Sequence, residues 1–151
     1  MAGTFSQIYI QYVFAVKGRE NLLQRVWRDE IFKYIAGIIK GKNQKPIIVN
    51  GVADHIHVFV GLKPSMSISD LVRDIKNNSA NYINEKKYVH GKFSWQEGYG
   101  AFSYAHSQIE NVYQYIANQE VIIKRKHSEK NILIFFKDLK LNLTKNMYSN
   151  G

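Results

Sequence analysis

The segment from Ala53 to Val60 constrains the fold more than any other part of the chain. It reads ADHIHVFV, a short apolar run rich in β-branched and aromatic residues, which is typical of a buried strand. Side chains alternate between the two faces of a strand, so His55, His57 and Phe59 share one face. A buried polar ring needs a partner. This strand therefore places two imidazoles where one metal ion can bind both.

An isolated His-x-His pattern also has a simpler explanation, because short motifs of this kind often occur without function. Hydroxyl or carbonyl groups of neighbouring residues can satisfy two buried histidines. Taken alone, the pattern favours that explanation over a metal site. The choice between the two depends on residues elsewhere in the chain.

The other hydrophobic patterns predict one small α+β domain that spans residues 1–151, with the last ten frayed. Strands are expected at about residues 5–16, 45–52, 53–60 and 99–104, and helices at about 21–39, 67–86, 107–124 and 132–139. The order β-α-β-β-α-β is that of the ferredoxin-like fold, in which the third strand is normally central. We therefore predict a ferredoxin-like antiparallel sheet with additional C-terminal helices.

Three local signals predict where elements begin or turn. Asn50-Gly51 is typical of a hairpin turn, so the strands around it are expected to pair antiparallel. Ser67 followed by Asp70, and Ser107 followed by Glu110, predict the N-terminal caps of two helices.

The chain is strongly basic, with 21 Lys and Arg against 12 Asp and Glu and a formal net charge of +9. A compact basic domain attracts polyanions, although a generic solvated surface explains the charge equally well. The absence of cysteine excludes disulfides, thiolate catalysis and cysteine-ligated zinc. The N-terminus is not signal-like and no uncharged run reaches membrane-spanning length, so we expect a cytoplasmic protein with no membrane partner.

The predicted helix that follows residue 107 carries a tyrosine and a glutamine one turn apart. Its apolar stripe is formed by residues spaced i, i+3, i+4 and i+7: Ile109, Val112, Tyr113 and Ile116. Tyr113 is therefore expected to pack in the core. Tyr115 lies off the centre of the stripe, and Gln119 follows it by four residues on the same helix face. A surface pair explains Tyr115 and Gln119 by themselves, but together with the histidine strand in a basic chain they suggest a joint site.

Three motifs taken in order are far more specific than any one of them. They are His55-Ile56-His57, then Trp95-Gln96-Glu97-Gly98-Tyr99-Gly100-Ala101-Phe102-Ser103, then Tyr115-Ile116-Ala117-Asn118-Gln119. In this order they resemble the single-tyrosine HUH transposases, small insertion-sequence enzymes that move as single-stranded DNA, and their relatives associated with repetitive extragenic palindromes. After Gln119 the chain differs from the family pattern. Relatives often carry two histidines there, whereas this chain has Val121-Ile122-Ile123.

The resemblance implies an enzyme that cuts and rejoins single-stranded DNA at hairpin-marked element ends through a 5′-phosphotyrosine intermediate. The family's catalytic tyrosine falls on Tyr115. Its metal ligands, for Mg²⁺ or Mn²⁺, fall on His55, His57 and Gln119. The resemblance also implies a homodimer in a bacterial or archaeal cytoplasm.

Other polar residues have smaller expected roles. Asp54 points to the opposite face from His55 in a regular strand, so it is not expected to be a ligand. Glu97 is a candidate for a supporting role. The candidate contacts to DNA phosphates are Arg73, Lys76, Lys86 and Lys92.

Three alternatives remain. An RNA-recognition-like module would carry aromatic residues in place of His55 and His57. A phosphodiesterase that uses water as its nucleophile would not need Tyr115. A domesticated, non-catalytic relative would only bind hairpins or single strands, and it would not need the four site residues that this chain retains.

Overall fold

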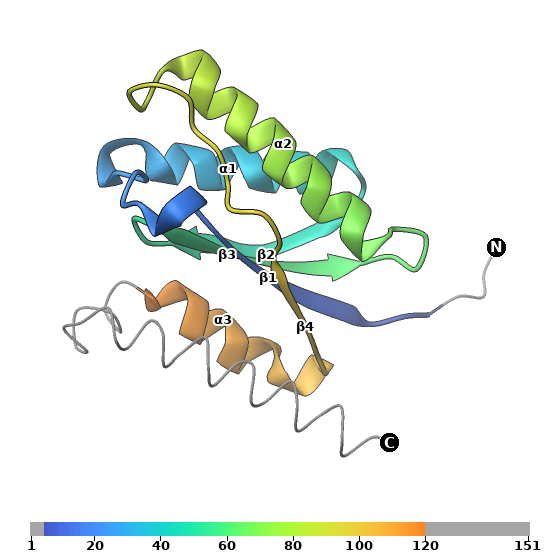
Figure 1. Ribbon diagram of the computed structural model, residues 1–151. Coiled ribbons are helices and arrows are strands. Elements are labelled where there is room, and N and C mark those ends of the chain that lie inside the picture. Colours follow the sequence, from blue (N-terminus) through green and yellow to red (C-terminus); the bar gives the residue numbers. More distant parts are fainter. Residues whose placement is uncertain (1–4, 120–151) are drawn as a thin grey trace. The chain divides into compact units, whose positions relative to one another are not determined.

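The structure is a computed structural model that describes residues 5–119 (Figure 1). Its strands are β1 (Ile8–Ala15), β2 (Lys45–Gly51), β3 (His55–Leu62) and β4 (Gly100–Tyr104), and its helices are α1 (Arg25–Gly41), α2 (Ile68–Lys86) and α3 (Ile109–Ala117), with short 3-10 turns η1 (Lys17–Arg19) and η2 (His106–Gln108). The chain divides into two compact units, and the first, which ends at Ala117, contains all these elements. No helix among the described residues is both long and apolar enough to cross a membrane.

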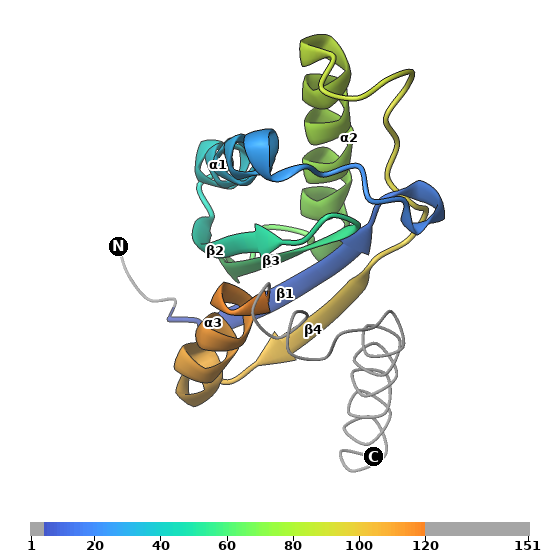
Figure 2. The ribbon, with the colours of Figure 1, turned by 90° about the vertical axis from the view of Figure 1, so that its left-hand side faces the viewer.

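The four strands form one antiparallel sheet in the order β2-β3-β1-β4. This order confirms the predicted ferredoxin-like fold, with the histidine strand β3 in the interior of the sheet between β1 and β2. Helices α1 and α2 cover one face of the sheet, and α3 lies on the opposite face (Figures 1 and 2). The fold therefore separates a core face, under α1 and α2, from a face that only α3 covers among the described helices.

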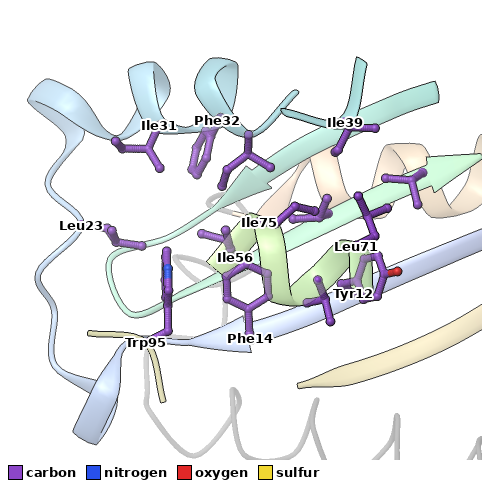
Figure 3. Close-up of a cluster of buried hydrophobic side chains, with 14 of the residues drawn as sticks. Tyr12, Phe14, Leu23, Ile31, Phe32, Ile39, Ile56, Leu71, Ile75 and Trp95 are labelled. Atoms are coloured by element: carbon purple, nitrogen blue, oxygen red, sulfur yellow. The ribbon is translucent and has the colours of Figure 1, made fainter. Parts of the chain in front are cut away.

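The hydrophobic core lies between the sheet and the helices α1 and α2 (Figure 3). Alternate residues of β1 and β3 point into it, including Tyr12, Phe14 and Ile56, and residues spaced by three or four come from the helices, including Ile31 and Ile75. Burying one such aliphatic side chain stabilises a fold by about 1.5–3 kcal/mol. Because side chains alternate along β3 and Ile56 points into the core, His55 and His57 lie on the opposite face of the sheet.

The Asn50-Gly51 pair is part of strand β2, and the expected antiparallel pairing of this strand with the histidine strand β3 is confirmed. The turn comes one step later, where the Val52 N–H donates to the His55 carbonyl at 3.0 Å. A Cβ atom on Gly51 would lie 2.4 Å from the same carbonyl oxygen. The glycine therefore serves the close approach of two strand backbones rather than a turn conformation.

Of the two predicted helix caps, one is confirmed. The Ser67 hydroxyl accepts a hydrogen bond from the Asp70 N–H at 3.3 Å at the start of α2. The Ser107 cap is wrong, because the chain enters α3 through the 3-10 turn η2 and the Gln108 Oε1 accepts from the Ala105 N–H at 2.8 Å. The expected continuation of this helix to residue 124 and the further helix at 132–139 extend beyond the described residues.

Candidate active site

Two buried histidines stand together on the face of β3 that is turned away from the core. His55 is 1% exposed and His57 is 0% exposed, and their ring centroids lie 5.2 Å apart. The strand alternation places them as the sequence predicted, with Ile56 between them packed into the core on the other face.

Each imidazole directs its Nδ1 atom to an acceptor within the chain. His55 Nδ1 lies 2.8 Å from Oδ1 of Asp54, and His57 Nδ1 lies 2.8 Å from Oε1 of Gln11. An oxygen acceptor at Nδ1 favours the tautomer with the proton on Nδ1 and the lone pair on Nε2. The Nε2 atoms of both rings are buried as well. This is the arrangement that metal-binding histidines use, with a hydrogen bond from the second nitrogen fixing the ring.

Asp54 is held as a carboxylate although it is largely buried. Burial acts to raise the pKa of Asp54, but the interactions with His55 and Arg19 outweigh it and bring the pKa below its usual value. Arg19 Nε lies 3.4 Å from Oδ2 of Asp54, on the carboxylate oxygen that His55 does not use. Both carboxylate oxygens are therefore engaged, one with His55 and the other with Arg19, and Asp54 serves to orient the His55 ring.

Helix α3 brings a tyrosine to this pair. The Tyr115 ring lies 6.5 Å from the His57 ring between centroids, with the two planes at 79°. The end of the helix is tied to the sheet, because Asn50 Nδ2 donates to the carbonyls of Ile116 at 2.9 Å and of Ala117 at 3.4 Å. Asn50 is the strand partner of His57 in the β2–β3 register. One residue beside His57 therefore fixes the helix turn that carries Tyr115.

The neighbouring Tyr113 is 38% exposed, so its predicted place in the core is wrong. The apolar residues Ile109, Val112 and Ile116 define the centre of the stripe, and Tyr113 and Tyr115 lie on its two flanks. At about 100° per residue, either flank can complete an amphipathic face. In the structure the Tyr115 flank is directed to the histidines.

The third predicted ligand, Gln119, is the last residue described and belongs to the second compact unit. Its role as a ligand stays a prediction. Among residues 5–119, no three His, Cys, Asp or Glu side chains come together as a metal site.

The central motif that begins at Trp95 is structural at its start. The Trp95 Nε1 donates to the Ser79 hydroxyl at 3.0 Å, and its ring packs edge-on against Phe14 at 4.8 Å between centroids. The Gln96 N–H donates to the Ala15 carbonyl at 2.7 Å. These contacts fasten the loop before β4 to the end of β1, and the exposed Glu97 does not lie among the buried groups of the site.

Two of the four basic side chains proposed as DNA contacts, Lys76 and Arg73, make contacts within the chain. Lys76 Nζ donates to the carbonyls of Gln96 and Gly98 at 2.8 and 2.9 Å, and burial lowers the pKa of Lys76. Arg73 pairs with Asp70 at 3.2 Å. Helix α2, which carries both, covers the core face of the sheet rather than the face with Tyr115 (Figure 2).

Sequence reasoning missed the groups that hold the site in place: Gln11, Asn50 and Tyr104. Gln11 is 2% exposed, and its Nε2 donates to the Tyr104 hydroxyl at 2.8 Å. Burial raises the pKa of Tyr104, against the smaller opposing effect of this hydrogen bond. A polar residue inside an apolar strand was the available signal for Gln11, because such a residue requires a buried partner.

The fold and the site together define a ferredoxin-like protein with a tyrosine beside a pair of strand histidines. A sequence model of the IS200-like transposases matches residues 4–119, which is most of the chain. The chain therefore belongs to the IS200-like transposase family. Transposases of this kind act on DNA, which agrees with the basic character of the chain.

Two solved structures share the fold. A putative transposase from Deinococcus radiodurans R1 has a TM-score of 0.64 at 20% identity, and the match covers 79% of this chain and 95% of that one. A REP-associated tyrosine transposase bound to a REP hairpin has a TM-score of 0.57 at 14% identity, covering 80% of this chain and 73% of that one. The comparison with curated proteins gives no match.

Proposed function

We propose that this transposase cuts and rejoins single-stranded DNA beside hairpins, with Tyr115 as the nucleophile. The observation that carries the proposal is the position of the Tyr115 ring, 6.5 Å from the ring of His57 on a helix fixed to the same sheet. A tyrosine hydroxyl next to a pair of imidazoles is a nucleophile next to groups that can bind a phosphate-activating ion.

The reaction is a phosphoryl transfer in two reversible steps. The Tyr115 hydroxyl gives up its proton and its oxygen bonds to the scissile phosphorus. The bond from phosphorus to the 3′-oxygen breaks, and that oxygen takes up a proton and leaves as a hydroxyl. The 5′ side of the cut DNA stays on the enzyme as a phosphotyrosine. Because an ordinary phenol has a pKa near ~10, the phenolate leaves more readily than an alkoxide. A DNA 3′-hydroxyl can therefore reverse the step and rejoin strands without ATP.

The residues fit a divalent ion of the Mg²⁺ or Mn²⁺ type. His55 and His57 would offer Nε2 lone pairs, because their Nδ1 atoms face Asp54 and Gln11. Gln119 would add an amide oxygen, which leaves positions for phosphate and water. Bound there, the ion would withdraw charge from the scissile phosphate and hold it for in-line attack.

The substrate proposal follows from charge and from the family. The net charge of +9 suits a polyanion, and phosphate contacts supply affinity without sequence specificity. One solved relative is described as bound to a REP hairpin. We infer that this chain also binds a DNA hairpin. We further propose that the hairpin is imperfect and has a short single-stranded flank, and that the protein acts as a homodimer.

Replacement of Tyr115 by phenylalanine tests the nucleophile. Tyr115→Phe removes one oxygen and little packing, so folding and hairpin binding should persist while cleavage of labelled single-stranded element-end DNA falls by several orders of magnitude. Tyr113→Phe is the matched control on the same helix and should cleave normally. The measurement is a denaturing gel in Mg²⁺ or Mn²⁺, with peptide mass mapping of the covalent adduct.

Other results would point elsewhere. An adduct that persists in Tyr115→Phe, or one that maps to Tyr113, would contradict the assignment. Cleavage without any adduct would favour the hydrolase that uses water as its nucleophile.

A further inference from the structure

Gln11 is a buried polar residue with two partners on two different strands. It lies in β1, opposite Phe59 of β3 and Phe102 of β4 in the strand registers. Its Oε1 lies 2.8 Å from His57 Nδ1, and its Nε2 lies 2.8 Å from the Tyr104 hydroxyl. The amide therefore joins the strand that carries His57 to the edge strand β4.

The direction of this amide decides which nitrogen of His57 carries the lone pair. With Oε1 toward the ring, Nδ1 must be the donor, and Nε2 keeps its lone pair for a ligand bond. With the amide turned over, its N–H₂ group would donate to Nδ1, and the proton would move to Nε2, which then could not bind a metal. The hydroxyl of Tyr104 accepts from the amide in the first arrangement and donates to it in the second, so it can serve both.

The two histidines differ in this respect. Asp54 is a carboxylate and can only accept a hydrogen bond, so His55 must carry a proton on Nδ1. His57 depends on an amide that has both a donor end and an acceptor end. We propose that Gln11 is a positioning residue for metal binding, and that its amide, with the oxygen toward His57 Nδ1 and the nitrogen donating to Tyr104, keeps the His57 Nε2 available as a ligand. The inference rests on the proposed metal site.

The first test observes the tautomer without metal and without DNA. Long-range ¹H–¹⁵N correlation spectra of protein labelled at histidine nitrogens distinguish the two tautomers of a neutral imidazole. In the wild-type protein, His57 should carry its proton on Nδ1. In Gln11→Met, which keeps the length of the side chain and removes its polar atoms, the spectra should show loss of this single tautomer.

The second test measures Mn²⁺ affinity by calorimetry. Loss of a group that orients a metal ligand typically costs about 10–100-fold in affinity, and we expect this loss for Gln11→Met. Gln11→Glu restores an oxygen acceptor toward Nδ1 and should bind Mn²⁺ within a few-fold of wild type. Tyr104→Phe, which removes one of the two hydrogen-bond partners of the amide, should show a smaller loss than Gln11→Met.

Tyr12→Phe provides the matched control. Tyr12 lies next to Gln11 in β1, but its hydroxyl donates to the Ile68 carbonyl at 2.7 Å on the core side of the sheet. Its loss should lower thermal stability and leave Mn²⁺ affinity and the His57 tautomer unchanged. A merely structural role of Gln11 would produce the same pattern in Gln11→Met as in Tyr12→Phe.

The outcomes separate this inference from the proposed function. A wild-type His57 with its proton on Nε2, or full Mn²⁺ affinity in Gln11→Met, would overturn the role of Gln11. If Gln11→Met does not fold, the wild-type spectrum and Gln11→Glu still decide. A wild-type protein with the expected tautomer but no Mn²⁺ binding would instead count against the metal site.

Discussion

At the scale of single residues, the metal site should depend on both strand histidines. We expect His55→Ala and His57→Ala together to abolish Mn²⁺ binding, because each removes a buried nitrogen donor whose ring is oriented by its own acceptor. Calorimetry of the double variant against wild type provides the measurement. His90→Ala is the control, because His90 is exposed in the loop that follows α2. Equal affinity in the double variant and the wild type would eliminate the site.

The residues of the site differ in how far the sequence could predict them. The two-residue spacing of His55 and His57 is a local property of one strand, so alternation alone places them on a common face. The contact between His57 and Gln11 joins residues 46 positions apart. Such a contact depends on the strand register, which the hydrophobic pattern limits but does not specify residue by residue.

At the scale of elements, the link between α3 and β2 should control the position of Tyr115. The last carbonyls of a helix lack intrahelical donors, and Asn50 supplies one to Ile116 and Ala117. Asn50→Ala should destabilise the end of α3 by about 1 kcal/mol. Hydrogen exchange of the α3 amides should become faster and DNA cleavage slower.

The control for this prediction is Asn81→Ala, because Asn81 is an exposed residue of α2 on the other side of the sheet. It should leave both exchange in α3 and cleavage as they are. Unchanged exchange in Asn50→Ala would show that packing of residues such as Ile116, rather than this hydrogen bond, holds the helix.

The elements themselves were largely predictable, since period-two and helical patterns come from burial on one face. The residues at which the elements begin and end, and the way the helices pack on the sheet, were less predictable from the sequence. Helix α1 begins at Arg25 rather than near residue 21, because the preceding segment runs extended with Leu23 buried and its N–H bonded to the Ala53 carbonyl at 2.9 Å. Which of Tyr113 and Tyr115 faces the histidines likewise depends on how α3 packs on the sheet. The periodicity of the helix allows either tyrosine to do so.

At the scale of the whole chain, the residues that stabilise the first unit and the residues of the candidate site lie on opposite faces of the sheet. The core between the sheet and helices α1 and α2 carries most of the buried apolar residues, whereas the polar groups around His57 occupy the opposite face. Several basic residues serve the fold, as Lys76 does in holding the loop before β4. We therefore expect attraction to DNA to come from the excess of positive charge over the whole chain.

This distribution of charge leads to a prediction about binding. An imperfect hairpin with a single-stranded flank should bind more tightly than a perfect duplex of the same length, because the unpaired flank can reach the Tyr115 face. Affinity for either DNA should fall steeply with salt, since each phosphate contact releases counterions and makes the slope of log K against log salt more negative by about 0.7–0.9. Fluorescence anisotropy with Tyr115→Phe protein, which binds without cutting, measures both affinities. A perfect duplex that competes as well as the hairpin at moderate salt would show that the charge attracts DNA without selecting its shape.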